Sequence, residues 1–299
     1  MLNIGIVGLK NAKPFIEALS GLSAFSFRGI YDPCLLMDRH LQTDYDVFRS
    51  FGDLCLNCQA VIFSIDDNLY HPLICEAIRH SLDVFIGGVH TYQTKELNAL
   101  LTLRDEAGCV VHIGQPLIYT DLFKALRKHC SRPLDIQCNI SKNESKNLVA
   151  LAHSELGMLL SLVKAPVHKV SVNVYSSFGS VPDTMRVRLD FDNGTVGNVC
   201  IARYGLAEEH HVKVLNYNSL VEADMLKGQL LLVDSDSPDV LVRQRLKQSN
   251  STIEQAQLTS FYSCIMGGTE IHNCLENEIR TQLACERVRE KMRVNFNVF

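Results

Sequence analysis

A glycine and an aspartate near the start of the chain stand where a dinucleotide-binding turn needs them. Gly8 follows the apolar run Leu2–Val7, and Asp32 follows a second apolar run. Such a glycine permits the tight turn into the helix whose N-terminus faces a pyrophosphate, and such a carboxylate binds the ribose hydroxyls. The full G-x-G-x-x-G pattern is absent, because Lys10 and Lys13 take the second and third glycine positions. Asp32 therefore has two interpretations, a ribose ligand or a cap of an ordinary strand–turn–helix.

Two residues of an apolar segment further along could exchange protons with a substrate. His153 and Glu155 stand together at the start of a helix expected over 153–163. An imidazole or carboxylate placed in this way can serve as a general acid or base. The competing interpretation is structural, since a glutamate near a helix N-terminus is favoured by the helix dipole. Tyr119 is the other candidate proton donor.

The cysteines do not form a metal-binding pattern. The chain has 11 of them, and Cys55 and Cys58 form one C-x-x-C without a second pair at zinc-ribbon spacing. A structural zinc site normally needs four ligands, so we predict no metal. Without an export signal, most of the cysteines are expected to be reduced and to pack as small apolar residues.

Composition excludes several classes of function. There are 29 basic and 33 acidic residues, which gives a net charge of −4 without long charged runs. A nucleic-acid-binding protein normally has a basic patch, and none is visible. No apolar run reaches the roughly 20 residues of a membrane span, and the first residues are typical of a strand rather than of a signal peptide. We expect a soluble, cytoplasmic protein whose partners are small molecules.

The first part of the chain alternates between short apolar strands and helices. This alternation predicts a Rossmann-type, doubly wound parallel sheet over residues 1–121. The expected strands are 2–7, 27–31, 60–65, 83–86 and 109–113, and the expected helices between them are 14–22, 72–80 and 95–106.

The pattern changes in residues 122–299, for which we predict an α/β domain with a largely antiparallel open sheet. Strands are expected at 134–140, 168–175, 185–191 and 196–203, and helices at 121–129, 153–163 and 276–293. Asp192-Asn193-Gly194-Thr195 predicts a type I′ hairpin turn, whose two central residues need positive φ. A tight hairpin joins antiparallel strands, so these segments form a second sheet.

Taken in order, several segments resemble the glucose–fructose oxidoreductase/inositol dehydrogenase (Gfo/Idh/MocA) family. The resemblance begins with IGIVGL and continues through QAVIFSIDDNLYHP, SLDVFIGGVHTYQT, VRLDFDNGTVGNV and VLNYNSLVEADM to the closing FYSCIMGGTEIHNCLENEIRTQLACERVRE. It covers nearly the whole chain. It implies a nicotinamide-dependent oxidoreductase fold that acts on a sugar or cyclitol.

The residues in the family's catalytic positions differ from its pattern. The family's Glu-Lys-Pro, whose lysine shuttles protons, corresponds here to Gly87, Gly88 and Val89. The resemblance places Gly8, Lys10, Asn11, Asp32, Asp66, His71 and Gly87 at the cofactor. Asp66 and its neighbour Asp67 add negative charge there, so NAD binding is expected to be weak or absent. If the cofactor binds, Asp32 favours NAD over NADP, because a carboxylate repels a 2′-phosphate.

Two functions remain open. The chain is either a divergent NAD(P)-dependent oxidoreductase, with His153 or Tyr119 in place of the lysine, or a non-catalytic ligand-binding or regulatory protein that keeps the fold. Whether it is an enzyme is not decided by its sequence. We also expect a homodimer, because family members associate through the open sheet and apolar residues are expected on both faces of this one, as in 170–175 and at Val199 and Ile201.

Overall fold

The computed structural model describes residues 1–33, 45–64, 70–87, 92–142, 148–176, 182–234, 237–245, 251–267 and 275–296. The chain divides into two compact units. Unit 1 comprises Met1–Pro116 and Asn250–Ile279, and unit 2 comprises Leu117–Ser249 and Arg280–Phe299. The expected division has a single boundary after residue 121. In the structure, a late segment with helix α8 (Ile253–Ile265) returns to unit 1.

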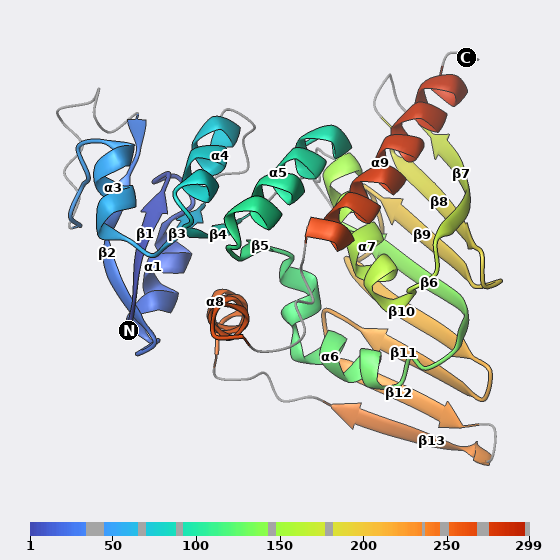
Figure 1. The fold of residues 1–299 in the computed structure, drawn as a ribbon. Helices are drawn as coiled ribbons and strands as arrows, with labels where there is room; N and C mark the ends of the chain where they lie inside the picture. The colour runs from blue at the N-terminus through green and yellow to red at the C-terminus, as the bar shows by residue number, and fades with distance from the viewer. Residues whose placement is uncertain are drawn as a thin grey trace. The chain divides into compact units, whose positions relative to one another are not determined.

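The described part of unit 1 contains a five-stranded parallel sheet in the order β2-β1-β3-β4-β5 (Figure 1). Its strands are β1 (Leu2–Val7), β2 (Phe25–Tyr31), β3 (Ala60–Phe63), β4 (Asp83–Ile86) and β5 (Val111–Ile113). Its other helices are α1 (Lys13–Ser20), α3 (Phe51–Asn57), α4 (His71–Arg79) and α5 (Thr94–Ala107). The predicted doubly wound parallel sheet is confirmed.

One residue outside the named strands also pairs with the sheet, at the edge formed by β2. Val47 forms a parallel bridge with Ile30, whose N–H donates to Asp46 O at 2.8 Å. If this bridge is counted as a one-residue strand, the sheet has the order 3-2-1-4-5-6 of dinucleotide-binding folds. The direction of winding then changes between β1 and β3. Ligands of such sheets bind outside the carboxyl ends of the strands at this point.

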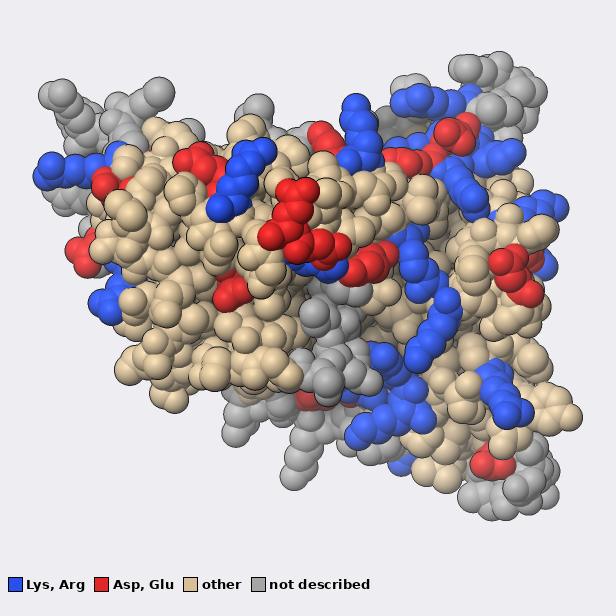
Figure 2. Space-filling view, viewed as in Figure 1, with Lys and Arg blue, Asp and Glu red and all other residues tan. Residues whose placement is uncertain are grey.

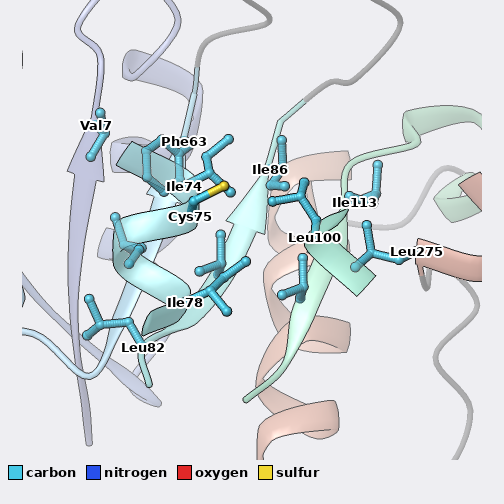
Figure 3. Packing of buried hydrophobic residues seen from close by; sticks show 14 of the residues in the cluster. Val7, Phe63, Ile74, Cys75, Ile78, Leu82, Ile86, Leu100, Ile113 and Leu275 are labelled. Carbon is cyan, nitrogen blue, oxygen red and sulfur yellow. The ribbon is translucent and has the colours of Figure 1, made fainter. Parts of the chain in front are cut away.

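Helices cover both faces of this sheet. Figure 3 shows one face, where Ile74 and Ile78 of α4 and Leu100 of α5 pack over Phe63 and Ile86. On the other face, Ile16 and Leu19 of α1 and Leu258 and Phe261 of α8 pack against Ile4, Ile6 and Phe85. Because all these side chains are buried, burial of apolar surface holds the helices against both faces of the sheet.

The described part of unit 2 contains an eight-stranded sheet in the order β13-β12-β11-β10-β6-β9-β8-β7. All neighbouring strands are antiparallel except β6 and β9, so the predicted, largely antiparallel sheet is confirmed. The strands are β6 (Pro133–Ser141), β7 (Val167–Tyr175), β8 (Thr184–Phe191), β9 (Val196–Ala202), β10 (Glu209–Asn216), β11 (Ser219–Asp224), β12 (Gln229–Asp234) and β13 (Ser237–Arg245).

Three helices accompany this sheet. Helix α7 (Leu148–Leu162) packs on β6 and β9, and α6 (Asp121–Lys128) packs on β11 and β12. Helix α9 (Leu275–Phe296) begins in the last segment of unit 1 and continues through unit 2. In unit 2, Arg280 of α9 donates to Val163 O and Ala165 O at 2.9 and 3.0 Å. Among the described helices, none combines the length and the apolar character required to cross a bilayer.

The hairpin between β8 and β9 is antiparallel, as predicted, but its turn is not type I′. Gly194 has φ of +84°, whereas Asn193 does not have the positive φ that the first central residue of such a turn needs. Phe191 N–H donates to Thr195 O at 3.0 Å, and Asn193 Oδ1 accepts from Thr195 N–H at 3.2 Å. The loop therefore has three residues and ends in a left-handed glycine. The side chain of Asn193 stabilises the turn, although its backbone does not have the positive φ of a type I′ turn.

The expectation of apolar residues on both sheet faces is largely wrong. Val170, Val172, Val199 and Ile201 are all buried on the side of the helices. The alternating positions of β7 and β8 on the other side are mostly polar or charged. That face does carry one apolar row, in which Leu215, Leu220, Val233 and Leu241 are paired in sequence across β10, β11, β12 and β13.

Candidate functional site

The turn after β1 has the backbone geometry of a ligand-binding turn at its first glycine. Gly8 is buried, has φ of +90°, and donates its N–H to Tyr31 O at 2.9 Å. The carbonyl oxygen of Gly8 accepts the hydroxyl of Ser64 at 2.6 Å. Ser64 follows β3, so this bond joins the two strands at which the winding changes. Ser64 was not among the predicted site residues, because the strand expected over 60–65 included it, whereas β3 ends at Phe63.

Asp32 lies beside this turn, as the sequence predicted. Its side chain is buried, and Oδ2 accepts the N–H of Leu9 at 2.8 Å. A carboxylate in this position braces the turn between β1 and α1. The bond supports the structural interpretation of Asp32 directly.

The rest of the turn lacks the open backbone that a pyrophosphate needs. Lys10, Asn11 and Lys13 are exposed, and Nζ of Lys13 lies 3.9 Å from Glu17 of its own helix. The N-cap residue of α1 is Ala12, which has no side-chain capping bond. Side chains at positions 10 and 13 occupy the surface where a dinucleotide would contact glycine backbone. These residues do not fit the usual mode of dinucleotide binding.

Glycines also end the last two strands of the sheet in unit 1. A Cβ atom on Gly87 would lie 3.1 Å from Phe63 O, and one on Gly114 would lie 2.8 Å from Gly87 O. The backbones after β3, β4 and β5 thus approach each other more closely than side chains allow. A side chain at position 87, where the family has a glutamate, would make a tight contact with Phe63 O. Gly88 and Asp66 lie outside the described residues.

His71, the other expected cofactor residue, packs into the protein. It begins α4, its Nε2 lies 3.5 Å from Cys75 Sγ, and its ring meets Tyr92 with 5.5 Å between centroids. Its Nδ1 is buried and has no hydrogen-bond partner among the described residues. Burial lowers the pKa of His71, which favours the neutral ring. The described groups of His, Cys, Asp and Glu include none that could hold a metal ion.

Both candidate proton donors of unit 2 are buried. Tyr119 ends a short 3₁₀ helix over Pro116–Tyr119, and its exposed fraction is 6%. His153 lies in α7 with 7% exposed. His153 and Glu155 are two positions apart in this helix, so their side chains point to different sides of it.

Glu155 instead pairs with a residue that the sequence analysis missed. Its Oε2 lies 3.2 Å from Nε2 of His210, near the start of β10. The side chains are 4% and 13% exposed, respectively. The sequence contained only one sign of this pair, the run Glu208-Glu209-His210-His211. This run is too far from Glu155 in the sequence for the two to be neighbours on one helix.

The charged surface is mixed. Figure 2 shows Lys and Arg side chains interspersed with Asp and Glu on the face that it presents. Arg104 illustrates this arrangement, since its guanidinium lies 2.8 Å from Glu276 and 2.7 Å from Asp105. The hydrogen bonds that Arg104 donates to these carboxylates, first of all to Glu276, raise its pKa.

Comparison with known proteins gives a match in structure alone. No protein-family model and no curated protein sequence matches the chain. UDP-N-acetylglucosamine 3-dehydrogenase GnnA from Acidithiobacillus ferrooxidans matches with a TM-score of 0.84 and 15% identity, over 99% of each chain. The dehydrogenase MviM from Clostridium difficile matches with a TM-score of 0.81 and 14% identity, over 97% of this chain and 99% of that one.

A third match carries the cofactor. An oxidoreductase from Agrobacterium radiobacter, in complex with NAD⁺, L-tartaric acid and magnesium, has a TM-score of 0.80 and 11% identity, over 98% of this chain and 96% of that one. At identities this low, the structural matches establish the fold and leave the activity open. Over nearly its whole length, this chain has the fold of the Gfo/Idh/MocA-type dehydrogenases that its sequence resembles.

Proposed function

We propose that this chain is a divergent homologue of the sugar and cyclitol dehydrogenases that binds a polyol-type ligand and has lost their lysine-dependent dehydrogenation. The observation that carries the proposal is the turn after β1, where two exposed lysines stand at glycine positions and Asp32 is bonded to Leu9. The replacement of the catalytic lysine by Gly88 supports it from the sequence. A positioned base contributes about 10²–10⁴-fold to such a step, and glycine has no group to supply it.

Binding of NAD should accordingly be weak or absent. Calorimetry on the parent is expected to give a dissociation constant for NAD weaker than micromolar. The double variant Lys10→Gly/Lys13→Gly rebuilds G-x-G-x-x-G from Gly8 onward and should bind more tightly. Lys10→Ala/Lys13→Ala is the matched control, since it removes the same charges but keeps a Cβ at position 10. Micromolar or tighter binding by the parent would refute the proposal for the cofactor.

The loss of dehydrogenation is tested by NAD reduction with a panel of sugars and inositols. We expect no turnover by the parent and a trace of activity in Gly88→Lys, because the lysine supplies both a base and a cation for the developing alkoxide. His153→Ala completes the set. Robust turnover by the parent that His153→Ala abolishes would reject the inactive homologue and identify His153 as the base.

An NAD-dependent oxidoreductase with a different proton donor is the second candidate function. It is favoured by the buried Asp32 at the end of β2 and by the NAD⁺-bound protein of the same fold. In that case Tyr119 or His153 would replace the lysine, and NAD should be preferred over NADP. Asp32→Ala should then reduce the preference, because the carboxylate that repels a 2′-phosphate is gone. An unchanged ratio of the two affinities would count against this candidate.

We infer a cytoplasmic location from the thiols. The described cysteines are reduced thiols, and several of them are buried. Free thiols persist in reducing compartments.

A further inference from the structure

His210 and Glu155 form an ordered pair between two layers of unit 2. Glu155 projects from α7, and His210 lies on the side of β10 that faces the helices, in register with Ile140 of β6. Cys138, two residues before Ile140, is fully buried nearby. Burial and then the charge of Glu155 raise the pKa of its thiol. Side chains from α7, β6 and β10 therefore meet around one carboxylate.

The chemistry of the pair fixes which nitrogen of the ring carries hydrogen. When the carboxylate of Glu155 is ionised, it only accepts hydrogen bonds, and Nε2 of His210, which lies 3.2 Å from Oε2, is then the donor. In the neutral ring, Nδ1 is then left as an acceptor. His210 makes no other side-chain hydrogen bond among the described residues, and its side chain retains 13% exposure. This is the arrangement by which a carboxylate orients an imidazole toward a substrate hydroxyl.

A purely structural pair is the competing explanation. Burial of two ionisable groups costs desolvation energy, and well-packed apolar residues often stabilise a fold as well or better. Leu, Val or Ile would fill the interface between α7 and β10 without that cost. The neighbouring Val212 and Val214 do so on the same side of β10. The histidine and glutamate thus lie next to these apolar residues, near the start of the strand.

We propose that His210, positioned by Glu155, is a ligand-binding residue of unit 2 whose Nδ1 accepts a hydrogen bond from a hydroxyl group of a polyol-type ligand. The proposal rests on the proposed function for the class of ligand. The assignment of the open ring nitrogen comes from the geometry alone. Glu155 is a positioning residue, because it acts through the imidazole.

The test uses His210→Gln, which removes only the nitrogen in question. The glutamine amide can still donate to Glu155, so the pair and the fold are kept, but no group replaces Nδ1. His211→Gln is the matched control, since His211 is the next residue, lies on the opposite face and approaches only Asp224, at 3.9 Å. Calorimetry with UDP-N-acetylglucosamine and myo-inositol as probes should show an affinity loss of about tenfold for His210→Gln. His211→Gln should bind like the parent.

A second measurement does not depend on the ligand. Nitrogen NMR of the ¹⁵N-histidine-labelled full chain, assigned by comparison with His210→Gln, should show hydrogen on Nε2 of His210 and none on Nδ1. Glu155→Gln should shift this balance, because an amide can also donate to the ring. A change in packing alone would not exchange the two nitrogens.

The outcomes separate the two proposals. If the parent binds neither probe, the proposed function fails for these ligands, and the NMR result alone decides the assignment of His210. If the parent binds a probe and His210→Gln binds it equally well, the proposed function stands and the inference about His210 is overturned. Hydrogen on Nδ1 in the parent also overturns it.

Discussion

His112 shows how far the interior of unit 1 controls an ionisable group. The side chain in β5 is fully buried, and its ring stacks on Phe85 with 5.3 Å between centroids. Burial lowers the pKa of His112 to about 3. The unfolded chain takes up a proton near pH 6.5 and the folded chain does not, so stability is full above pH 6.5 and falls as the pH drops toward 3.

Replacement of this histidine should remove that part of the pH dependence. Between pH 7 and pH 5, the parent should lose about 2 kcal/mol more of its free energy of unfolding than His112→Phe, since each pH unit below 6.5 costs about 1.4 kcal/mol. Urea unfolding at the two pH values measures the difference. Equal losses in both proteins would show that the ring is protonated in the folded state.

The C-x-x-C of α3 should be chemically inert, unlike that of a thiol oxidoreductase. Burial raises the pKa of Cys55 to about 11 and that of Cys58 to about 12. Both lie at the C-terminal end of the helix, whereas reactive cysteines lie at helix N-termini, which stabilise the thiolate. Mass spectrometry after brief treatment with a disulfide reagent at pH 8 should find both unlabelled in the native protein and labelled in urea. Rapid native labelling of Cys58 would contradict this.

The contact between α7 and β9 depends on a glycine. A Cβ atom on Gly197 would lie 2.8 Å from Cδ2 of Leu159, which is fully buried in α7. Gly197→Ala should therefore destabilise unit 2 by about 1–3 kcal/mol, the usual cost of overpacking a core. Gly52→Ala in α3 is the control, because its Cβ would make only an ordinary contact, 3.8 Å from Ser50 Oγ, and the substitution should raise stability by about 0.4–1 kcal/mol. Thermal unfolding compares the two, and equal melting temperatures would argue that Leu159 yields freely.

The helices and strands that the sequence predicted were those with strong local patterns. The strand 83–86 was predicted to the residue, and α5 within one residue at each end. Helix α8 was not predicted separately, because long-range packing holds it in place. Its Leu258 and Phe261 pack against strand residues such as Phe85, more than 150 positions earlier in the sequence. The predicted type of the β8–β9 turn was wrong, because Asn193 stabilises the turn through its side chain and does not adopt a left-handed backbone conformation.

The residues of the candidate site also differ in whether a local sequence pattern could predict them. The positions of Gly8 and Asp32 follow strand ends, so apolar runs were enough to find them. The bond from Ser64 to Gly8 and the pair of Glu155 and His210 join residues 56 and 55 positions apart. Such pairings depend on sheet order and register, which no local pattern encodes.

The assembly of the whole molecule remains a proposal, and the open face of the sheet in unit 2 gives it a physical basis. The row of Leu215, Leu220, Val233 and Leu241 crosses four strands, and its two ends are 44% and 53% exposed. The next row is charged, with Lys213 and Glu222 paired at 2.8 Å. A twofold axis would place one such face against another, so that apolar and charged groups of each copy meet their counterparts.

We therefore expect a homodimer that buries this row. Light scattering at micromolar concentration should give twice the chain mass of 33.5 kDa. Leu215→Lys/Leu241→Lys should shift the protein toward the monomer, because a dimer would bury charges that have no partner on the apolar row. Leu56→Lys is the control, since Leu56 is 86% exposed in α3 of unit 1 and should leave the mass unchanged. A monomeric parent would refute the dimer, and a double variant that stays dimeric would move the interface to another surface.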